Sequence, residues 1–347
     1  MEEIASINHE LPQANKIGNI RINYFENDKP SGVIPIVRSN GEVLLLVEIM
    51  GYCGRSRLIV QDLNGNVVKE LLKFGYEFGQ VTADDQYIYV FTCNTETPMY
   101  YVFDKNTFEK RFEKPIGPSW ISSVCCDGNY VYTYDTENGN LQKRDKKGTV
   151  LNQNYASHEY VRGGTKLYST SQGIQYVLTG NYRIPEDYKK ICTDKYGDEF
   201  MDLNNSWEDI ALDEKTQTRF ISAHNVILVA KDDKIEGIIY CPDRNILRIS
   251  VDQQIGALLI SAHNDSEKKK EDIFYSGGVL EILPIDMIPE RMKWSDAVLT
   301  ERYKNKRIIK MCHEIVDESN GDINKIIERL ESLINKRGIE TDQGKVL

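Results

Sequence analysis

The chain has 347 residues, of which 40% are hydrophobic and 28% charged, as expected for a globular protein with a sizeable core. Acidic residues outnumber basic ones by 53 to 43, and the net charge of −10 disfavours binding to nucleic acid or anionic lipid. The acidic start lacks the layout of a signal peptide, and no apolar run approaches the roughly 18 residues that cross a bilayer. We therefore expect no membrane insertion and a cytoplasmic location as synthesised.

The chain begins with an expected arm over residues 1–16. Residues 20–25 then alternate between apolar and polar types, which predicts a strand. A strand at this position could close a ring of repeats by completing the last repeat, as terminal strands often do.

A strand–turn–strand unit recurs from residue 58 onward. In the first copy, β-forming residues lead into the turn Asp62–Gly65 and resume after it. Asp and Asn favour turns because their side chains bond nearby backbone, and Gly readily adopts positive φ. The turn aspartates recur at intervals of 41 to 49 residues, at Asp62, Asp104, Asp145, Asp194, Asp243 and Asp286.

A second marker runs in phase with the first. Asp84 and Asp127 each open a turn that enters an alternating strand, and they lie 43 residues apart. Two hairpins in each repeat indicate four short strands, which is the layout and period of a propeller blade. We therefore predict an all-β fold: a single β-propeller over residues 17–294 with about six four-stranded blades, and seven as the alternative count.

The run from about Val33 to Asp286 resembles the broad β-propeller class whose blades carry strand–Asp-x-x-Gly–strand hairpins, as in quinoprotein-like and YVTN-like repeats. The Trp-Asp dipeptide of WD40 repeats is missing, and the double glycine of kelch repeats is not sustained. The resemblance thus identifies no specific family, and it implies a fold without implying an activity. The fourth repeat is irregular, and its stretch 180–220 is expected to hold exposed loops.

From Ser295 the apolar pattern changes to a helical period, which predicts a helical hairpin over 295–338 and a flexible tail over 339–347. Two helices cannot bury an apolar stripe by themselves, so the hairpin must dock on its own propeller, on a second copy or on a partner protein. The positions expected at this contact are Ile308, Met311, Ile315, Ile323, Ile326, Ile327, Leu330, Leu333 and Ile334.

Catalytic signatures are missing from the sequence. No nucleotide-binding, serine-hydrolase or zinc-helix motif occurs, and we predict no catalytic residue, no metal and no cofactor. His224 and His263 lie in identical Ile-Ser-Ala-His-Asn words, either as lining of one propeller face or as turn residues of a duplicated blade. Aromatic residues at loop tips supply rigid contact area, so Trp120, Trp207 and Tyr182 are candidates for a binding rim.

These observations favour a non-catalytic binding or scaffold protein that contacts protein partners through its C-terminal helices and propeller face. Such a chain could be a structural or receptor-recognition subunit of a bacterial or phage-tail-like assembly, with a cell-surface glycan as a possible ligand. Two alternatives stay open. One is a metal-dependent propeller hydrolase of lactonase type, and the other is a carbohydrate-binding propeller of sialidase or lectin type.

Overall fold

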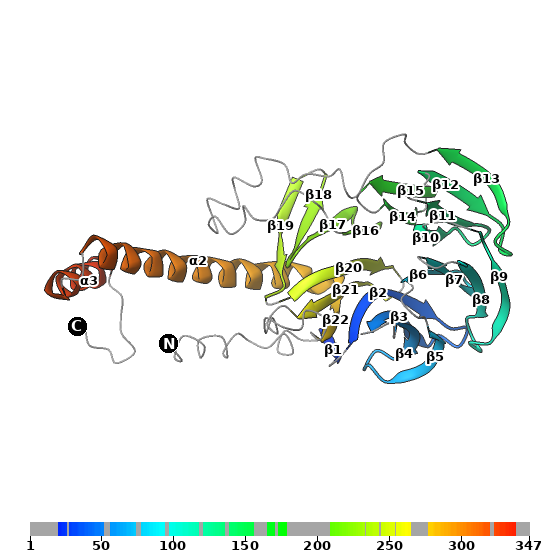
Figure 1. Cartoon of the computed structure of the whole chain (residues 1–347), viewed down its shortest axis with the longest axis horizontal. Helices are drawn as coiled ribbons and strands as arrows, with labels where there is room; N and C mark the ends of the chain where they lie inside the picture. Colours follow the sequence, from blue (N-terminus) through cyan, green and yellow to red (C-terminus); the bar gives the residue numbers. More distant parts are fainter. Residues whose placement is uncertain are drawn as a thin grey trace.

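The computed structural model of the chain describes residues 20–25, 28–51, 56–73, 78–93, 97–117, 121–135, 139–155, 165–170, 173–178, 209–232, 234–242, 244–253, 255–264, 277–319 and 323–337. Within these residues the chain forms five four-stranded antiparallel sheets, one two-stranded sheet and two α-helices (Figure 1). The sheets are the blades of a β-propeller, and the helices form an arm that extends away from them.

The blades follow the chain order, and within each one neighbouring strands pair antiparallel. The first is β2 (Asp28–Val37), β3 (Val43–Gly51), β4 (Arg57–Gln61) and β5 (Val67–Lys73). The second is β6 (Phe78–Ala83), β7 (Tyr87–Cys93), β8 (Met99–Asp104) and β9 (Lys110–Pro115). The third is β10 (Ile121–Cys126), β11 (Val131–Asp135), β12 (Asn140–Arg144) and β13 (Val150–Tyr155).

The next sheet contains only β14 (Thr165–Thr170) and β15 (Gly173–Leu178) among the described residues. It is followed by β16 (Asp209–Asp213), β17 (Thr218–Ala223), β18 (Val226–Lys231) and β19 (Lys234–Tyr240). The last blade is β20 (Arg244–Asp252), β21 (Ala257–Asn264), β22 (Gly278–Pro284) and, from the start of the chain, β1 (Arg21–Phe25).

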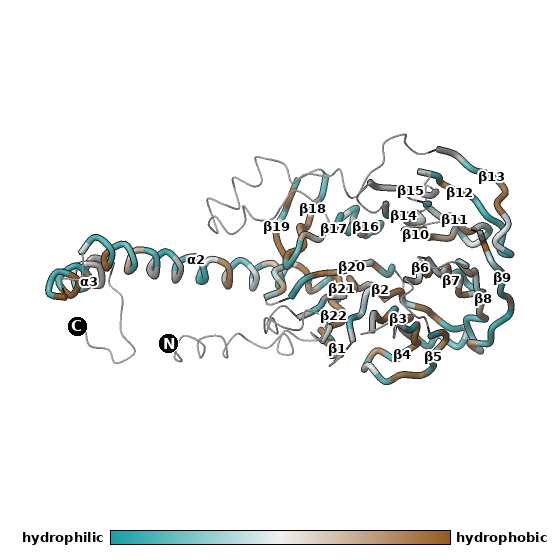
Figure 2. The backbone as a smooth tube through the Cα atoms, in the orientation of Figure 1, coloured by the Kyte–Doolittle hydropathy of each residue, from teal (hydrophilic) through white to brown (hydrophobic). Residues whose placement is uncertain are grey.

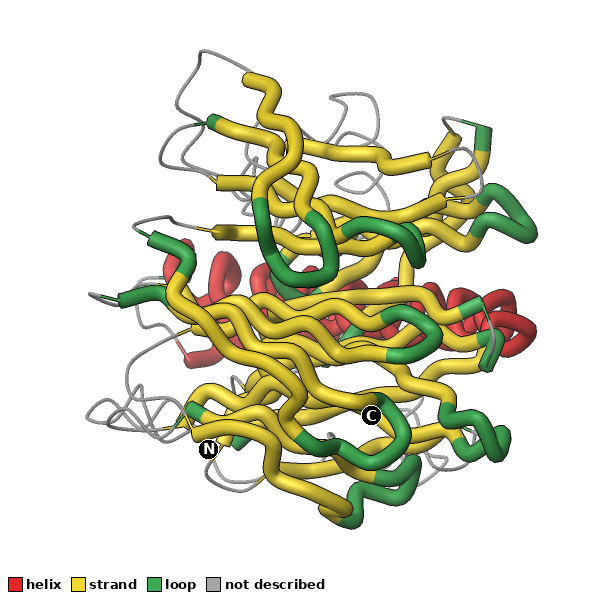
Figure 3. The backbone as a smooth tube through the Cα atoms, turned by 90° about the vertical axis from the view of Figure 1, so that its right-hand side faces the viewer, coloured by secondary structure: helices red, strands yellow, loops and turns green. Residues whose placement is uncertain are grey.

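The first strand of each sheet faces the propeller axis. Around this ring β2 lies beside β6 and β20, β10 lies beside β6 and β14, and β16 lies beside β20. Viewed from the end opposite the arm, the strands lie in front of the helices (Figure 3). The inner strands are thus arranged around the axis, and the ion pair between Lys166 and Asp209 links β14 to β16.

The ring is closed by β1. It pairs antiparallel with β22, in a register that runs from Arg21 opposite Ile282 to Phe25 opposite Gly278. The prediction that residues 20–25 complete the last blade is thus confirmed. The last blade is built from both ends of the propeller sequence, so β22 would be an unpaired edge without β1.

The predicted count of about six four-stranded blades is wrong, because the residues that the structure describes form five four-stranded blades. The fourth repeat accounts for the difference: between the β13 and β16 strands, the described residues contribute only the two-stranded sheet β14–β15. The irregular composition of this stretch marked its departure from the repeat. Of the stretch 180–220, which was expected to hold loops, residues 180–208 and the marker Asp194 lie outside the described residues. Residues 209–220 form β16, a turn and the start of β17.

The first three turn aspartates have the predicted role. Asp62, Asp104 and Asp145 each open the turn between the third and fourth strands of a blade, where the carboxylate accepts backbone N–H bonds. The Oδ1 atom of Asp62 accepts from the N–H groups of residues 64 and 66 at 2.8 and 2.9 Å. Asp145 Oδ1 accepts from those of residues 147 and 149 at 3.0 and 2.7 Å. The turn is therefore held by its own side chain, as its composition predicts.

The last marker, Asp286, does not have this role. Asp286 lies in the short 3₁₀-helix η5 (Ile285–Met287), because the fourth strand of the last blade comes from the start of the chain and needs no turn there. Asp243 lies outside the described residues, in the link between β19 and β20, which belong to two different blades. In the β16–β19 blade, the third and fourth strands are joined by the short link between Lys231 and Lys234, which leaves no room for an Asp-x-x-Gly turn.

The core lies mainly between neighbouring blades. Leu46 and Leu58 of the first blade pack with Ile88 and Phe103 of the second, and all four are buried. Likewise Leu45 and Val47 pack with side chains of the last blade. Hydrophobic stretches are visible along the strands of the propeller in Figure 2. Each blade is thus stabilised chiefly by the apolar surface that it buries against its neighbours.

Two helices follow the last blade: α2 (Ile288–Glu318) has 31 residues and α3 (Ile323–Arg337) has 15. The first begins at Ile288, seven residues before the change of period at Ser295. The predicted hairpin is supported only in part, because α3 is half as long as α2 and meets only its far end (Figure 1). An ion pair of 2.6 Å between Arg329 and Glu318 joins the two helices.

Candidate functional site

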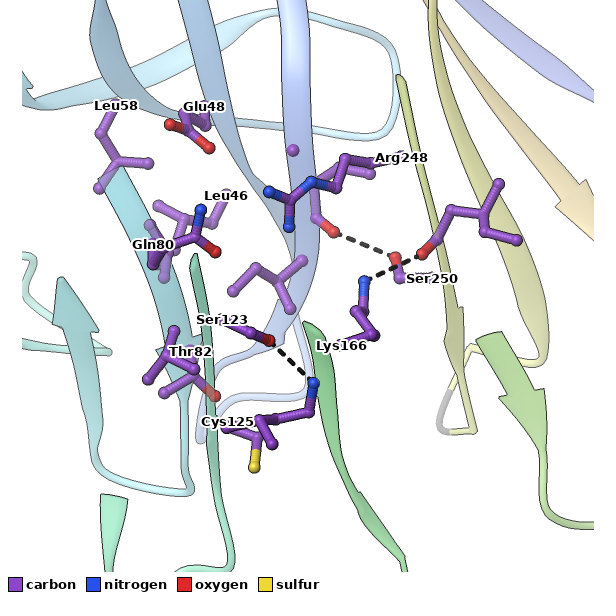
Figure 4. A pocket seen from close by; sticks show the side chains of 17 residues that line it. Leu46, Glu48, Leu58, Gln80, Thr82, Ser123, Cys125, Lys166, Arg248 and Ser250 are labelled. Atoms are coloured by element: carbon purple, nitrogen blue, oxygen red, sulfur yellow. Dashed lines mark hydrogen bonds between the residues drawn. The ribbon is translucent and has the colours of Figure 1, made fainter. Parts of the chain in front are cut away.

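A cavity of about 200 Å³ lies among the inner strands of the propeller (Figure 4). Its wall contains residues of β2, β6, β10, β14 and β20, together with side chains of β3 and β4 behind them. The charged residues in this wall are Glu48, Lys166 and Arg248. We call this space the axial cavity.

Lys166, on β14, is held by an acidic partner from the next inner strand. Its Nζ atom lies 3.1 Å from Oδ2 of Asp209, and the same carboxylate oxygen accepts the backbone N–H of Ile249 at 2.9 Å. Burial lowers the pKa of the Lys166 ammonium, and the negative charge of Asp209 offsets part of this effect. Three inner strands, β14, β16 and β20, are thereby linked around the axis.

Arg248, on β20, points into the axial cavity toward Gln80 of β6 (Figure 4). With the Gln80 amide oriented to satisfy both of its groups, its oxygen accepts from Arg248 Nη2 at 3.2 Å and its nitrogen donates to the carbonyl of Ser122 at 3.1 Å. The guanidinium is thus oriented by a neutral group.

Glu48, on β3, reaches the axial cavity past a glycine. Its Oε1 atom accepts the backbone N–H of Gly79 at 2.8 Å, and a Cβ atom at Gly32 would lie only 3.1 Å from its Oε2 atom. Burial raises the pKa of this carboxyl above its ordinary value, while Arg248 and the Gly79 bond act in the opposite direction with smaller effect. The absence of a side chain at Gly32 is what gives Glu48 access to the cavity.

The rest of the wall is mostly apolar, and the polar groups in it are largely engaged. Ser250 Oγ donates to the carbonyl of Val33 at 3.0 Å, and Ser123 Oγ accepts the N–H of Leu167 at 2.8 Å. Leu46, Leu58 and Val124 are among the aliphatic residues of the wall. This combination of apolar lining with a few convergent polar groups is typical of small-molecule sites.

The donor set of the axial cavity does not fit a divalent cation, because two of its three charged residues are themselves cationic. Among the residues that the structure describes, no three His, Cys, Asp or Glu side chains gather closely enough to hold a metal ion. The chemistry of the wall is suited to binding an anion through a guanidinium.

The second candidate region is the helical arm, whose first turns are anchored on the propeller. Ser295 Oγ accepts the backbone N–H of Tyr240 at 2.9 Å and donates to the carbonyl of Arg291 at 2.8 Å. Leu299 is buried in an apolar cluster that also contains side chains of β16, β17, β18 and β19. The guanidinium of Arg302 also donates to the hydroxyl of Tyr240.

A buried ion cluster strengthens this anchor. Glu281 of β22 is fully buried, and its carboxylate lies 2.9 Å from Arg244 of β20 and 3.4 Å from Arg291 of α2. The guanidinium of Arg291 also lies 4.3 Å from the ring centre of Trp294. Because removing one member would leave a buried charge without its partner, the cluster ties the helix to the last blade.

Beyond Arg302 the arm leaves the propeller (Figure 1). At 1.5 Å per residue α2 is about 46 Å long, and it carries α3 at its far end. Val316, Ile323 and Ile327 are 47%, 69% and 49% exposed there. Ile323 and Ile327 are one helical turn apart and share a face of α3.

The remaining predicted contact residues of the arm fall into two groups. Met311, Ile315, Ile326 and Leu330 are half-buried. The side chains of Ile308, Leu333 and Ile334 lie outside the described part of the structure.

The predicted aromatic rim is not visible, because Trp120, Trp207 and Tyr182 all lie outside the described residues. The two Ile-Ser-Ala-His-Asn words lie at the ends of β17 and β21, which are the second strands of neighbouring blades. His224 is exposed, with φ at 53°, and lies in the turn after β17, whereas His263 pairs with Asn245 inside the last blade. The words are thus equivalent in position, but the two histidines are not equivalent in conformation.

The serines of the two Ile-Ser-Ala-His-Asn words mark positions next to the axis, which was not predicted from the sequence. These serines, Ser222 and Ser261, are fully buried and lie opposite Asp209 and Arg248 on the inner strands. Both serine hydroxyls donate to the carbonyls of those partners, at 3.3 and 3.2 Å. The duplicated word therefore marks the inner-strand positions that bring charges to the axis. Glu48 could have been noticed as the one charge in its apolar strand.

The fold and these two regions define a β-propeller protein with an axial cavity and a C-terminal helical arm. No family model matches the chain, and no curated protein matches it by sequence. No helix among the described residues combines the length and the apolar character needed to cross a membrane.

Several solved structures are similar to the chain. The β-propeller domain of Cps50 (Swd1) from Myceliophteria thermophila is 8% identical, with a TM-score of 0.49, and the match covers 75% of this chain and 98% of that one. Glutaminyl cyclase from Myxococcus xanthus is 10% identical, with a TM-score of 0.35 and coverage of 76% and 98%. The Dos1 propeller is 7% identical, with a TM-score of 0.33 and coverage of 74% and 54%. These similarities imply no shared activity or partner.

Proposed function

We propose that the chain is a non-catalytic binding protein, a propeller that its helical arm attaches to a partner protein. The observation that carries this proposal is the exposed apolar face of α3, with Ile323 and Ile327 held at the end of a helix whose other end is buried in the propeller. A short helix that exposes two isoleucines on one face is suited to lie in an apolar groove of another protein.

The propeller would then be the rigid body that the arm connects. Exposed apolar side chains also occur on the outer strands, at Val67 and Val68 of β5 and at Leu151 of β13. These positions support a contribution of the propeller surface to the same assembly. A role as a structural or receptor-recognition subunit of a bacterial or phage-tail-like particle, with a glycan as ligand, is the more specific form of this proposal and stays a prediction from the sequence.

The wall of the axial cavity favours this function over a lactonase-like hydrolase. That alternative needs a divalent cation on the axis, and Lys166 and Arg248 would repel one there. The carboxylate of Asp209, which could otherwise bind a cation, is already engaged by Lys166 and by the N–H of Ile249.

The test is co-purification of the tagged full-length chain from its source cells, compared with the double variant Ile323→Glu/Ile327→Glu. We expect the native chain to carry a partner protein at fixed stoichiometry and the double variant to lose it, because two carboxylates on the face of α3 cannot be buried in an apolar groove. Ser332→Glu is the matched control, since it adds the same charge at an exposed polar position of α3.

Three results would contradict the proposal. The double variant could retain the partner as well as the control does, which would show that α3 is not the attachment. The native chain could instead form a dimer in light scattering that the double variant dissolves, and a second copy would then be the occupant of this face. Stoichiometric metal together with hydrolytic activity in the purified chain would point to the enzyme instead.

A further inference from the structure

We propose that the axial cavity binds a small organic carboxylate, which Arg248 holds through its guanidinium while the apolar wall accepts the body of the ligand. This site is independent of the helical arm, so its test and the test of the attachment can fail separately.

The first step of the argument is the balance of charges in the wall. Lys166 is neutralised by Asp209 at 3.1 Å. The neutral amide of Gln80 contacts Arg248. The acidic residue of the wall is Glu48, and one of its carboxylate oxygens accepts the backbone N–H of Gly79. Burial also favours the protonated form of Glu48. Of the two cations in the wall, Lys166 has an ion pair, whereas Arg248 has only the longer-range attraction of Glu48 among the described residues. An anionic ligand would supply the missing ion pair.

The second step is the geometry of the donor. A guanidinium offers a planar pair of N–H groups that matches the two oxygens of a carboxylate. Gln80 fixes the Arg248 plane through Nη2, and the group points into the space between Glu48 and Gln80 (Figure 4). The site is thus oriented before a ligand arrives, which reduces the entropy lost on binding.

The third step is the size and polarity of the space. A cavity of about 150 Å³ is known to accept benzene, so a volume of about 200 Å³ admits one small ring with its carboxylate. The aliphatic side chains of Leu46, Leu58, Val124 and Leu167 form much of the wall. An inorganic anion would leave this apolar surface without contacts, and for that reason an organic carboxylate fits better than free phosphate.

The probe is benzoate, titrated calorimetrically into the full-length chain, with benzamide as the neutral ligand of the same shape and inorganic phosphate as the inorganic anion. We expect saturable 1:1 binding of benzoate with a dissociation constant at or below about 1 mM. Benzamide and phosphate should each bind at least about tenfold more weakly, since one lacks the charge and the other the apolar body.

Three variants and one control variant locate the site. Arg248→Gln should weaken benzoate binding by about tenfold or more, while Arg307→Gln, on the exposed middle of α2, should leave it unchanged. Arg248→Lys keeps the charge without the planar pair of donors, so its affinity for benzoate should lie between the affinities of Arg248→Gln and Arg307→Gln. This variant keeps the test decisive if Arg248→Gln does not fold. Glu48→Gln removes the competing acid and should bind benzoate at least as tightly as the native chain.

The proposal is overturned if benzoate shows no saturable binding to the native chain, or if benzamide or phosphate binds as tightly. It is equally overturned if Arg248→Gln and Arg248→Lys both bind benzoate like the native chain, because the ligand would then lie elsewhere. Loss of binding in Glu48→Gln would contradict the charge argument, since it would make Glu48 a ligand-binding group.

Discussion

At the scale of single residues, the turn aspartates stabilise their turns through hydrogen bonds and ion pairs that are stronger when the carboxyl group is ionised. Asp84 is the most strongly bound of them. Its Oδ2 atom lies 2.7 Å from both Lys146 Nζ and the hydroxyl of Tyr89, and its Oδ1 atom accepts the backbone N–H groups of residues 86 and 87. Burial alone would raise the pKa of Asp84, but these bonds outweigh it and hold the pKa below the ordinary 3.8.

The sign of the resulting pH dependence follows from this direction. A folded-state pKa below the unfolded value gives stability that is fully present above pH 3.8 and is lost as the pH falls through the folded value. We expect Asp84→Asn to lower the free energy of unfolding by roughly 1–3 kcal/mol at pH 7, and by less at pH 3, which lies below the ordinary pKa of 3.8. Urea denaturation at both pH values measures this. Asp85→Asn, at the exposed neighbouring position, is the control and should behave like the native chain at pH 7. A deficit that is equal at pH 7 and pH 3 would contradict the ionic origin of the effect.

At the scale of the element, α2 consists of an anchored part and a free part that should differ sharply in their effect on stability. The anchor extends from Ile288 to Arg302 and includes the bonds of Ser295 and the ion cluster at Glu281. Beyond Arg302, the tertiary contacts that the structure describes for α2 are those with α3.

Two truncations test this division. A chain that ends at residue 303 should keep its thermal midpoint within about 2 °C of the native value, because the anchor is intact. A chain that ends at residue 287 leaves the Tyr240 N–H without Ser295 and Glu281 without Arg291, and its midpoint should fall by roughly 5 °C or more. Differential scanning calorimetry compares the two. Similar losses in both chains would mean that the distal arm also stabilises the propeller.

The sequence predicted local features of the elements better than their spatial partners. The turns at Asp62, Asp104 and Asp145 were predictable because each is determined by side chains within a few residues. Asp286 was misassigned because the strand that pairs with β22 comes from the other end of the chain, which local patterns cannot reveal. Arg248 and Lys166 were missed for the same reason, since their site exists only once five inner strands meet.

At the scale of the whole molecule, the closing strand β1 should govern stability. Every residue of β22 from Gly278 to Leu283 is buried, and removing β1 would expose this edge and its backbone groups. We expect deletion of residues 1–26 to lower the thermal midpoint by roughly 10 °C or to cause aggregation. Deletion of residues 1–16 leaves β1 in place and serves as the control, with no expected change. If both deletions behave alike in calorimetry and gel filtration, ring closure by β1 is not what holds the last blade.

The pairing of Arg21 with Ile282 also imposes an order of events during synthesis. The ribosome makes β1 before every other described strand, yet β22, with which it pairs, is the last described strand to be made. The five sheets between them can form as they appear, but β1 must remain without its partner for almost the whole time of translation. The long loop between β1 and β22 therefore cannot close before the last described strand has been made, which makes a closed ring a sign that the propeller sequence has been completed.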